Sequence, residues 1–162
     1  MKLLLIIDVQ GGFINENTKQ IPEDIIKHVK NYDYDLIIAT RFINKVDSLY
    51  QTELNMKEMT MLSPKTRLVE GIGELADIVI MKSTYTALTE DVKKLLKKNE
   101  LKQVYIAGLN MEGSIMATAF NLFDRDIKPI ILSQLCGSVK GESMKQSTLE
   151  ILSHNIGKDN IL

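Results

Sequence analysis

The chain begins with five consecutive branched aliphatic residues, Leu3 to Ile7, and Asp8 ends this run. A short apolar run of this kind is typical of a strand that is buried on both faces, as in parallel sheets. Parallel α/β sheets place their functional groups at the carboxyl ends of the strands. Because a charge is costly to desolvate there, we expect Asp8 to have a function or a charged partner. An aspartate that caps the following loop is the alternative.

Similar apolar runs alternate with amphipathic stretches along the rest of the chain. The runs predict strands at residues 36–39, 78–81, 104–107 and 130–132. The amphipathic stretches predict helices at residues 22–30, 89–99, 111–123 and 143–154, with Pro22 in the first turn of one and Thr89 capping another. This alternation predicts an α/β fold: one domain over residues 1–162, with a mostly parallel sheet flanked by helices on both faces. The Met-rich segment 41–70 does not show this alternation and is predicted to be a long functional loop.

Composition excludes several classes of function. A net charge of -1 gives no electrostatic case for binding nucleic acid or an anionic membrane, and no apolar run has the length of a membrane span. The single cysteine, Cys136, forms no internal disulfide, which suits a cytoplasmic protein. The two histidines, His28 and His154, lie far apart and show no metal-site spacing, so we expect neither a metal nor another cofactor.

Three residues with chemical potential stand at or just after strand ends. Asp8 ends the first predicted strand, Lys82 follows the third, and Ser114 follows the fourth at the start of a helix. If these strand ends converge, an acid and a lysine can pair beside a hydroxyl, where free backbone N–H groups favour developing negative charge. Taken alone, Ser114 is more often a helix cap or a small packing residue.

Together these segments resemble the isochorismatase-like hydrolases, a superfamily that includes nicotinamidases and other cysteine amidases. The resemblance covers most of the chain, and its motifs occur in the family's order at residues 5–13, 81–87, 107–119 and 132–138. It implies a three-layer, Rossmann-like α/β fold and hydrolysis of a small molecule, with amide-type C–N cleavage as the ancestral chemistry.

The resemblance also implies a role for each strand-end residue. Asp8 takes the proton of the nucleophile and passes it to the leaving amine, while Lys82 keeps that acid ionised and steadies the nucleophile. Ser114 occupies the position of the nucleophilic cysteine. Backbone N–H groups in the turn of Leu109, Asn110 and Gly113 stabilise the oxyanion, and the family often has a cis peptide there, at Leu109–Asn110 in this chain.

Ser114 is the decisive departure from the family pattern. A thiol has a pKa of about 8.5 that local charge can lower, whereas a serine hydroxyl is much harder to ionise. Cys136 follows another strand and is not expected to replace it. The segment after the second strand, residues 40–44, has no histidine, so the resemblance implies no nicotinamidase-type metal site. Gly11-Gly12 replaces the usual Asn-Asp, which is expected to loosen that loop.

Three interpretations of Ser114 stay open at this point: a hydrolase that works without thiol chemistry, a natural pseudoenzyme that binds a ligand or partner, and an engineered change. We favour a hydrolase, because Asp8 and Lys82 are both present. Cleavage of a vinyl ether, which needs no thiol, is the alternative chemistry. Phe13, Arg41 and Tyr85 are predicted to line the substrate pocket, although Arg41 is equally expected to make a structural salt bridge. The resemblance implies a homodimer or a larger homo-oligomer.

Overall fold

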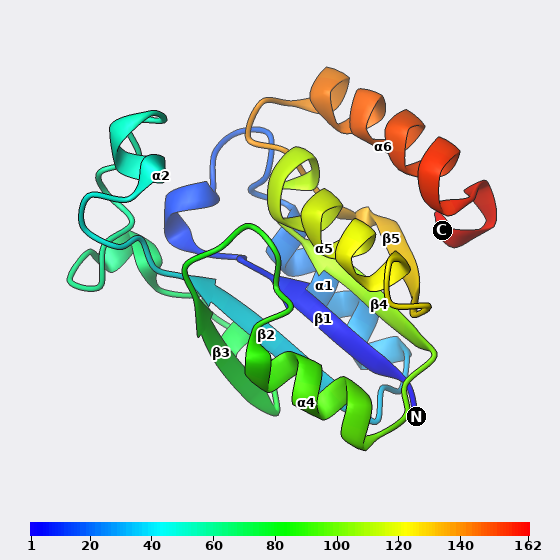
Figure 1. Ribbon diagram of the computed structural model, residues 1–162. Coiled ribbons are helices and arrows are strands. Elements are labelled where there is room, and N and C mark those ends of the chain that lie inside the picture. Colours follow the sequence, from blue (N-terminus) through cyan, green and yellow to red (C-terminus); the bar gives the residue numbers. More distant parts are fainter.

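The strand β1 (Leu3–Ile7) lies at the centre of a five-stranded parallel sheet in the computed structural model, which describes residues 1–162 (Figure 1). The strand order is β3-β2-β1-β4-β5, and every neighbouring pair is parallel. The other strands are β2 (Leu36–Phe42), β3 (Ile78–Lys82), β4 (Gln103–Gly108) and β5 (Lys128–Cys136). The predicted α/β architecture is confirmed.

All five residues of β1 are fully buried because the sheet is covered on both faces. Leu3, Leu5 and Ile7 belong to one apolar cluster, while Leu4 and Ile6 belong to a second cluster on the opposite face. Each aliphatic side chain buried in this way contributes about 1.5–3 kcal/mol to folding. The unbroken apolar run therefore reflects a central strand, and Asp8 leaves the core only where this strand ends.

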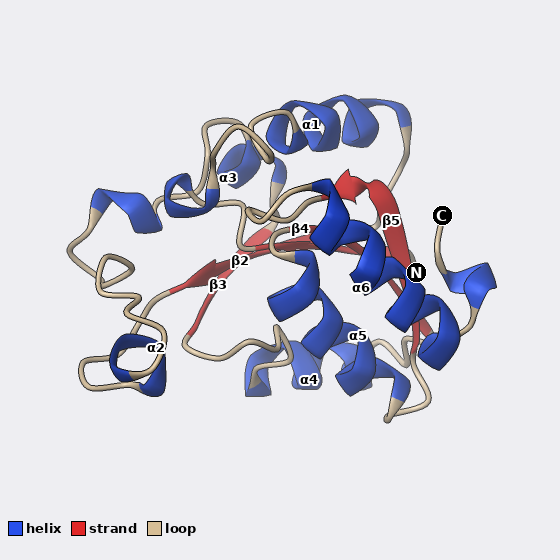
Figure 2. Ribbon diagram, turned by 90° about the horizontal axis from the view of Figure 1, so that it is seen from above, coloured by secondary structure: helices blue, strands red, loops and turns tan.

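The helices form two outer layers (Figure 2). Helix α1 (Ile21–Asn31) and the short α3 (Ile72–Leu75) cover one face, and α4 (Glu90–Lys98), α5 (Met116–Phe123) and α6 (Glu142–Ile156) cover the other. Pro22 stands in the first turn of α1, where its missing N–H needs no partner. Thr89 caps α4 by accepting a hydrogen bond from the Val92 N–H, as its sequence position predicted.

The predicted helix 111–123 is not uniform. Residues Met111–Ile115 form a π-helical turn (η3), and only then does the α-helix α5 begin. The Ile115 N–H bonds the Asn110 carbonyl five residues back, which widens the turn. Such π-type turns occur frequently at functional sites, and this one contains Ser114.

The segment between β2 and β3 projects from the carboxyl end of the sheet (Figure 1). It contains only the short helix α2 (Leu49–Thr52), the 3-10 turn η2 (Pro64–Thr66) and α3. Two further 3-10 turns, η1 (Gly11–Phe13) and η4 (Lys158–Asn160), complete the structure. None of the helices has the length and apolar character needed to cross a membrane.

Candidate active site

Asp8, Lys82 and Ser114 meet in one buried cluster at the carboxyl end of the sheet. The Lys82 ammonium lies 2.6 Å from Asp8 Oδ2, and the Ser114 hydroxyl donates to the same oxygen over 2.8 Å. Lys82 Nζ is also 3.3 Å from Ser114 Oγ. The side chains of Lys82 and Asp8 are 0% and 1% exposed, respectively. Three residues far apart in the sequence thus form a closed triangle of hydrogen bonds.

The strand order explains how these residues meet. Ser114 follows β4, which pairs directly with β1, whereas Lys82 ends β3, which is separated from β1 by β2. Lys82 therefore reaches across β2, and its ammonium lies 5.3 Å from the centre of the Phe42 ring. This contact adds a cation–π interaction to the ion pair with Asp8.

Lys82 is held by two further acceptors besides Asp8. Its ammonium donates to the carbonyl oxygens of Thr84 at 2.7 Å and Tyr85 at 3.1 Å. Burial lowers the pKa of Lys82 from its ordinary value, and the negative charge of Asp8 acts in the opposite direction. The lysine is thus a desolvated cation with fixed orientation, suited to stabilising negative charge on Ser114 Oγ.

Thr40 in β2 orients the carboxylate, and the sequence analysis did not single it out. Its hydroxyl donates to Asp8 Oδ1 over 2.7 Å and accepts from the Asp8 N–H over 3.2 Å. Asp8 itself has a positive φ of 49°, so the chain turns sharply as β1 ends. A polar residue that directly follows the apolar run Leu36–Ala39 is the sequence signal that could have identified Thr40, which is fully buried in the structure.

Gln10 belongs to the first motif and fixes the loop beyond β2. Its amide nitrogen donates to the carbonyl oxygens of Phe42 and Thr66, and its amide oxygen accepts from the Phe42 N–H. The neighbouring Gly12 packs closely: an added Cβ would lie 2.4 Å from Met59 Sδ. Gly12 therefore serves close packing, in contrast to the loosening that we expected, whereas a Cβ at Gly11 would come no nearer than 3.8 Å to Lys65 O.

The turn before Ser114 has the cis peptide at Leu109–Asn110 that the resemblance implied. Of the three predicted oxyanion residues, Leu109 donates its N–H to Ile7 O, and Gly113 donates its N–H to Asn110 O. The Asn110 N–H bonds no backbone acceptor and is free to serve a ligand.

Gly108 precedes this turn with a φ of 124°, and an added Cβ would lie 2.2 Å from the Ile7 carbonyl oxygen. Only glycine fits this close approach of β4 to β1.

A cavity of about 50 Å³ opens onto Asp8 and Ser114. Phe13 and Tyr85, both predicted pocket residues, line it together with Asn110 and Gly113 from the turn. Its remaining walls, which the sequence did not identify, are Phe42, Tyr50 and Met56. The ring of Tyr50 packs edge-on against those of Phe42 and Tyr85, so the long loop contributes an aromatic wall.

Arg41 is not among the residues that line this cavity. Its guanidinium donates to the carbonyl oxygen and the hydroxyl of Thr66, at 2.7 and 2.8 Å. Arg41 thus holds Thr66 through hydrogen bonds and makes no salt bridge, and its contact with the substrate stays a prediction. Leu109 is fully buried in the apolar core and contributes to the site only through its backbone.

Cys136 cannot act as the missing thiol. It is fully buried at the end of β5, and burial raises the pKa of its thiol to about 12. Its Sγ donates a weak hydrogen bond to the Ile106 carbonyl, which is consistent with a packing role.

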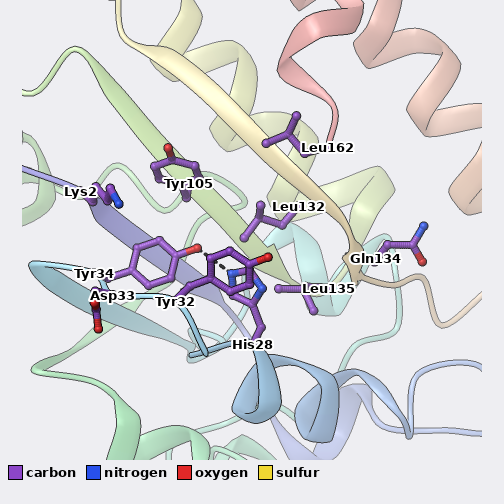
Figure 3. Close-up of a pocket in the computed structure, with 10 residues that line it drawn as sticks. All are labelled: Lys2, His28, Tyr32, Asp33, Tyr34, Tyr105, Leu132, Gln134, Leu135 and Leu162. Carbon is purple, nitrogen blue, oxygen red and sulfur yellow. Dashed lines mark hydrogen bonds between the residues drawn. The ribbon is translucent and has the colours of Figure 1, made fainter. Parts of the chain in front are cut away.

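A second cavity, of about 440 Å³, lies on the α1 face of the sheet and shares no lining residue with the first (Figure 3). Its walls include His28, Tyr32, Tyr34 and Tyr105. His28 stacks on Tyr32 and hydrogen-bonds the Tyr34 hydroxyl at 2.7 Å. Burial lowers the pKa of His28 and raises that of Tyr34 to about 12. Lys2 and Asp33 also line this cavity, but they form no ion pair, and none of its lining residues belongs to the cluster of Asp8, Lys82 and Ser114.

A comparison with known protein families identifies the family of this chain. The model of the isochorismatase domain matches residues 2–158, nearly the whole sequence. The chain belongs to the isochorismatase family of hydrolases. No curated protein matches its sequence.

Solved structures of this family have the same fold. A nicotinamidase/pyrazinamidase from Bacillus subtilis is 18% identical with a TM-score of 0.81, covering 97% of both chains. An isochorismatase-like hydrolase from Alkaliphilus metalliredigens is 19% identical with a TM-score of 0.80, covering 95% of this chain and 92% of the other. The pyrazinamidase of Pyrococcus horikoshii, solved in complex with zinc, is 22% identical with a TM-score of 0.78, covering 99% and 98%. At these identities the likeness shows a shared isochorismatase-like fold.

The residues of this chain do not fit a zinc centre. No group of three or more His, Cys, Asp or Glu residues lies close enough together to hold a metal ion. Asp8, the acid nearest the cavity, already accepts hydrogen bonds from Lys82, Ser114 and Thr40. No metal is therefore assigned a role in the reaction below.

Proposed function

We propose that this isochorismatase-like hydrolase cleaves the C–N bond of a small-molecule amide, with Ser114 as the nucleophile. One observation carries this proposal: the Ser114 hydroxyl lies within hydrogen-bond distance of both a carboxylate and an ammonium at the floor of a cavity. A nucleophile, a base and an orienting group within mutual reach are the elements of covalent hydrolysis.

The proposed reaction has two steps. Ser114 Oγ attacks the amide carbon as its proton moves to Asp8 Oδ2, and Asp8 then gives this proton to the departing nitrogen as the C–N bond breaks. Water hydrolyses the resulting serine ester, with Asp8 again taking and returning the proton, and releases a carboxylic acid. Lys82 stabilises the oxygen of Ser114 while it carries negative charge, and the free Asn110 N–H is a donor for the carbonyl oxyanion.

The solved relatives described as nicotinamidases and pyrazinamidases support amide hydrolysis as the class of reaction. The identity of the nucleophile distinguishes this chain from the family's cysteine amidases. A serine hydroxyl ionises far less readily than a thiol, so we expect slow turnover with the native residue.

The test is ammonia release from a panel of primary amides by variants at position 114. Ser114→Cys should raise the rate by at least about tenfold, because a thiolate forms more readily beside Lys82. Ser114→Ala should lower any native rate by about 10³-fold or more. Ser147→Ala, which changes an exposed serine in α6, is the matched control and should leave the rate unchanged. If neither the native protein nor Ser114→Cys releases ammonia from any amide, the proposal is wrong.

The serine itself favours one alternative, which is vinyl-ether cleavage by protonation from Asp8. This chemistry needs the acid and a water molecule that adds to the protonated ether before its C–O bond breaks, but no nucleophilic side chain. Asp8→Asn would then abolish activity, whereas Ser114→Ala would barely change it. A protein that only binds its ligand would instead leave that ligand intact, and its affinity would be insensitive to Lys82→Ala.

We also propose a homo-oligomer in a reducing compartment such as the cytoplasm. Exposed apolar side chains concentrate in the projecting segment, where Val46 is 80% and Leu62 is 95% exposed, and such patches mark interfaces. The free Cys136 is consistent with reducing conditions. Light scattering that shows a monomer at all concentrations would contradict the oligomer.

A further inference from the structure

The catalytic cavity continues into a larger one. The second part measures about 650 Å³, and Phe13, Met56, Tyr85, Asn110 and Gly113 line both parts. The shared walls make the two a single recess with Asp8 and Ser114 at its inner end. A substrate whose reacting group reaches Ser114 must therefore place its remaining atoms in the outer part.

The two parts differ greatly in size. One water takes about 30 Å³ of liquid volume, so the inner 50 Å³ has room for about two water-sized groups, such as a carboxamide. The outer 650 Å³ is within the range of about 300–1,000 Å³ that is typical of pockets for drug-sized ligands. A small flat amide would leave most of this volume unfilled.

The walls of the outer part are largely apolar. Its apolar lining residues include Phe13, Met56 and Tyr85, which also line the inner part, and Met116, Ala117 and Phe120. The last three lie in α5, which begins directly after the π-helical turn that holds Ser114. Two charged residues, Glu112 and Lys140, also line this part, and Glu112 Oε1 accepts a hydrogen bond from Ser138. Such a wall binds an apolar body through removal of its surface from water.

We propose that the substrates are primary carboxamides with an apolar body, such as hexanamide to decanamide or phenylalkyl amides. The amide group occupies the inner part against Ser114, and the hydrocarbon body lies along Met116, Ala117 and Phe120. Hydrolysis of such a substrate adds one water across the C–N bond and releases the fatty or arylalkyl acid and ammonia. This inference rests on the proposed amidase function and assigns its substrate class.

The test measures binding, so that it does not depend on turnover. The affinities of acetamide, butanamide, hexanamide and octanamide are determined by calorimetry on the Ser114→Ala variant, which cannot form the ester. Each added methylene that enters the outer part should raise the affinity about fourfold until the recess is filled. An affinity that is the same for acetamide and octanamide would overturn the proposal.

Two phenylalanines in α5 provide a matched pair of further variants. Phe120 lines the outer part, whereas Phe123, three residues later, is 45% exposed and does not. In the Ser114→Ala background, Phe120→Ala should weaken octanamide binding severalfold and leave acetamide unchanged, and Phe123→Ala should change neither. Because Phe120 also packs against the core, Ala117→Phe serves as a second variant that fills the recess without removing core contacts.

Ala117→Phe should abolish the gain in affinity with chain length. If the gain persists in this variant, the hydrocarbon binds elsewhere, for example in the aromatic cavity of Figure 3, and the proposal is wrong. If the gain is lost as expected but no amide is hydrolysed even by Ser114→Cys, the binding preference is correct and the amidase function is wrong. The two proposals therefore fail separately.

Discussion

Replacing Lys82 by methionine should destabilise the protein strongly. Methionine keeps much of the apolar stem of lysine but removes the ammonium that lies 2.6 Å from Asp8 Oδ2. Asp8, whose side chain is 1% exposed, then keeps a buried charge without a cation. Breaking a buried ion pair in this way costs about 3–5 kcal/mol. For a chain of this length, that corresponds to a decrease in Tm of about 6–20 °C.

A second substitution tests whether the unpaired charge is the cause. In the double variant Asp8→Asn/Lys82→Met neither charge is present, and the amide introduced at position 8 can still bond the Thr40 and Ser114 hydroxyls. Replacing both members of a buried pair is often nearly neutral, so stability should return to within about 1 kcal/mol of the native value. Because each single variant leaves one buried charge unpaired, the double-mutant cycle should give a coupling energy of at least about 2 kcal/mol.

Urea denaturation followed by far-UV circular dichroism measures these free energies. Lys93→Met is the control, because Lys93 pairs with Glu90 at a similar distance of 2.8 Å but on the surface of α4. Its midpoint should not change measurably, since exposed ion pairs contribute little. A Lys82→Met variant that loses less than about 1 kcal/mol, or a double variant less stable than either single one, would refute the assigned electrostatics.

Three further predictions concern packing, orientation and pH. Gly108→Ala should cost about 3 kcal/mol or more in urea denaturation, because its Cβ would collide with the Ile7 carbonyl at positive φ, and a native midpoint would contradict this. Thr40→Val should cost about 1.5–3 kcal/mol, because a hydrogen bond to a buried carboxylate is lost, and should lower kcat; unchanged kcat would exclude an orienting role. Burial lowers the pKa of His28 below 6.5, so the unfolded chain binds more protons and the native protein should lose stability relative to His28→Gln as pH falls through 6.5. The exposed His154→Gln serves as the control and should follow the native protein at every pH. If the Tm of His28→Gln changes with pH in the same way as the Tm of the native protein, the prediction is wrong.

The residues alone were sufficient to predict the central strand and its charged end. The apolar run Leu3–Ile7 and the cap at Thr89 depend on local patterns, and the structure confirms both. The cis peptide at Leu109–Asn110 could be expected only from the resemblance to the family, because no local pattern specifies it.

The contacts that orient Asp8, Lys82 and Ser114 could not be predicted, although the convergence of these three residues was expected. Thr40 orients Asp8 only because β2 lies between β1 and β3. No single segment of the sequence specifies this strand order. The same order requires Lys82 to extend over Phe42. Tyr50 lies in a segment without hydrophobic periodicity, where the direction of a side chain depends on tertiary packing. Its place in the cavity wall could therefore not be predicted.

The position of Lys82 on β3 has a consequence for how activity is lost. β3 is at the edge of the sheet and pairs only with β2, so it can separate without opening the pairs that hold Asp8 and Ser114. Edge elements open locally at lower free energy than central ones. A brief detachment of this strand would remove the cation while the core stays folded. The chain is therefore expected to pass through native-like but inactive forms as it warms, so that inactivation precedes melting.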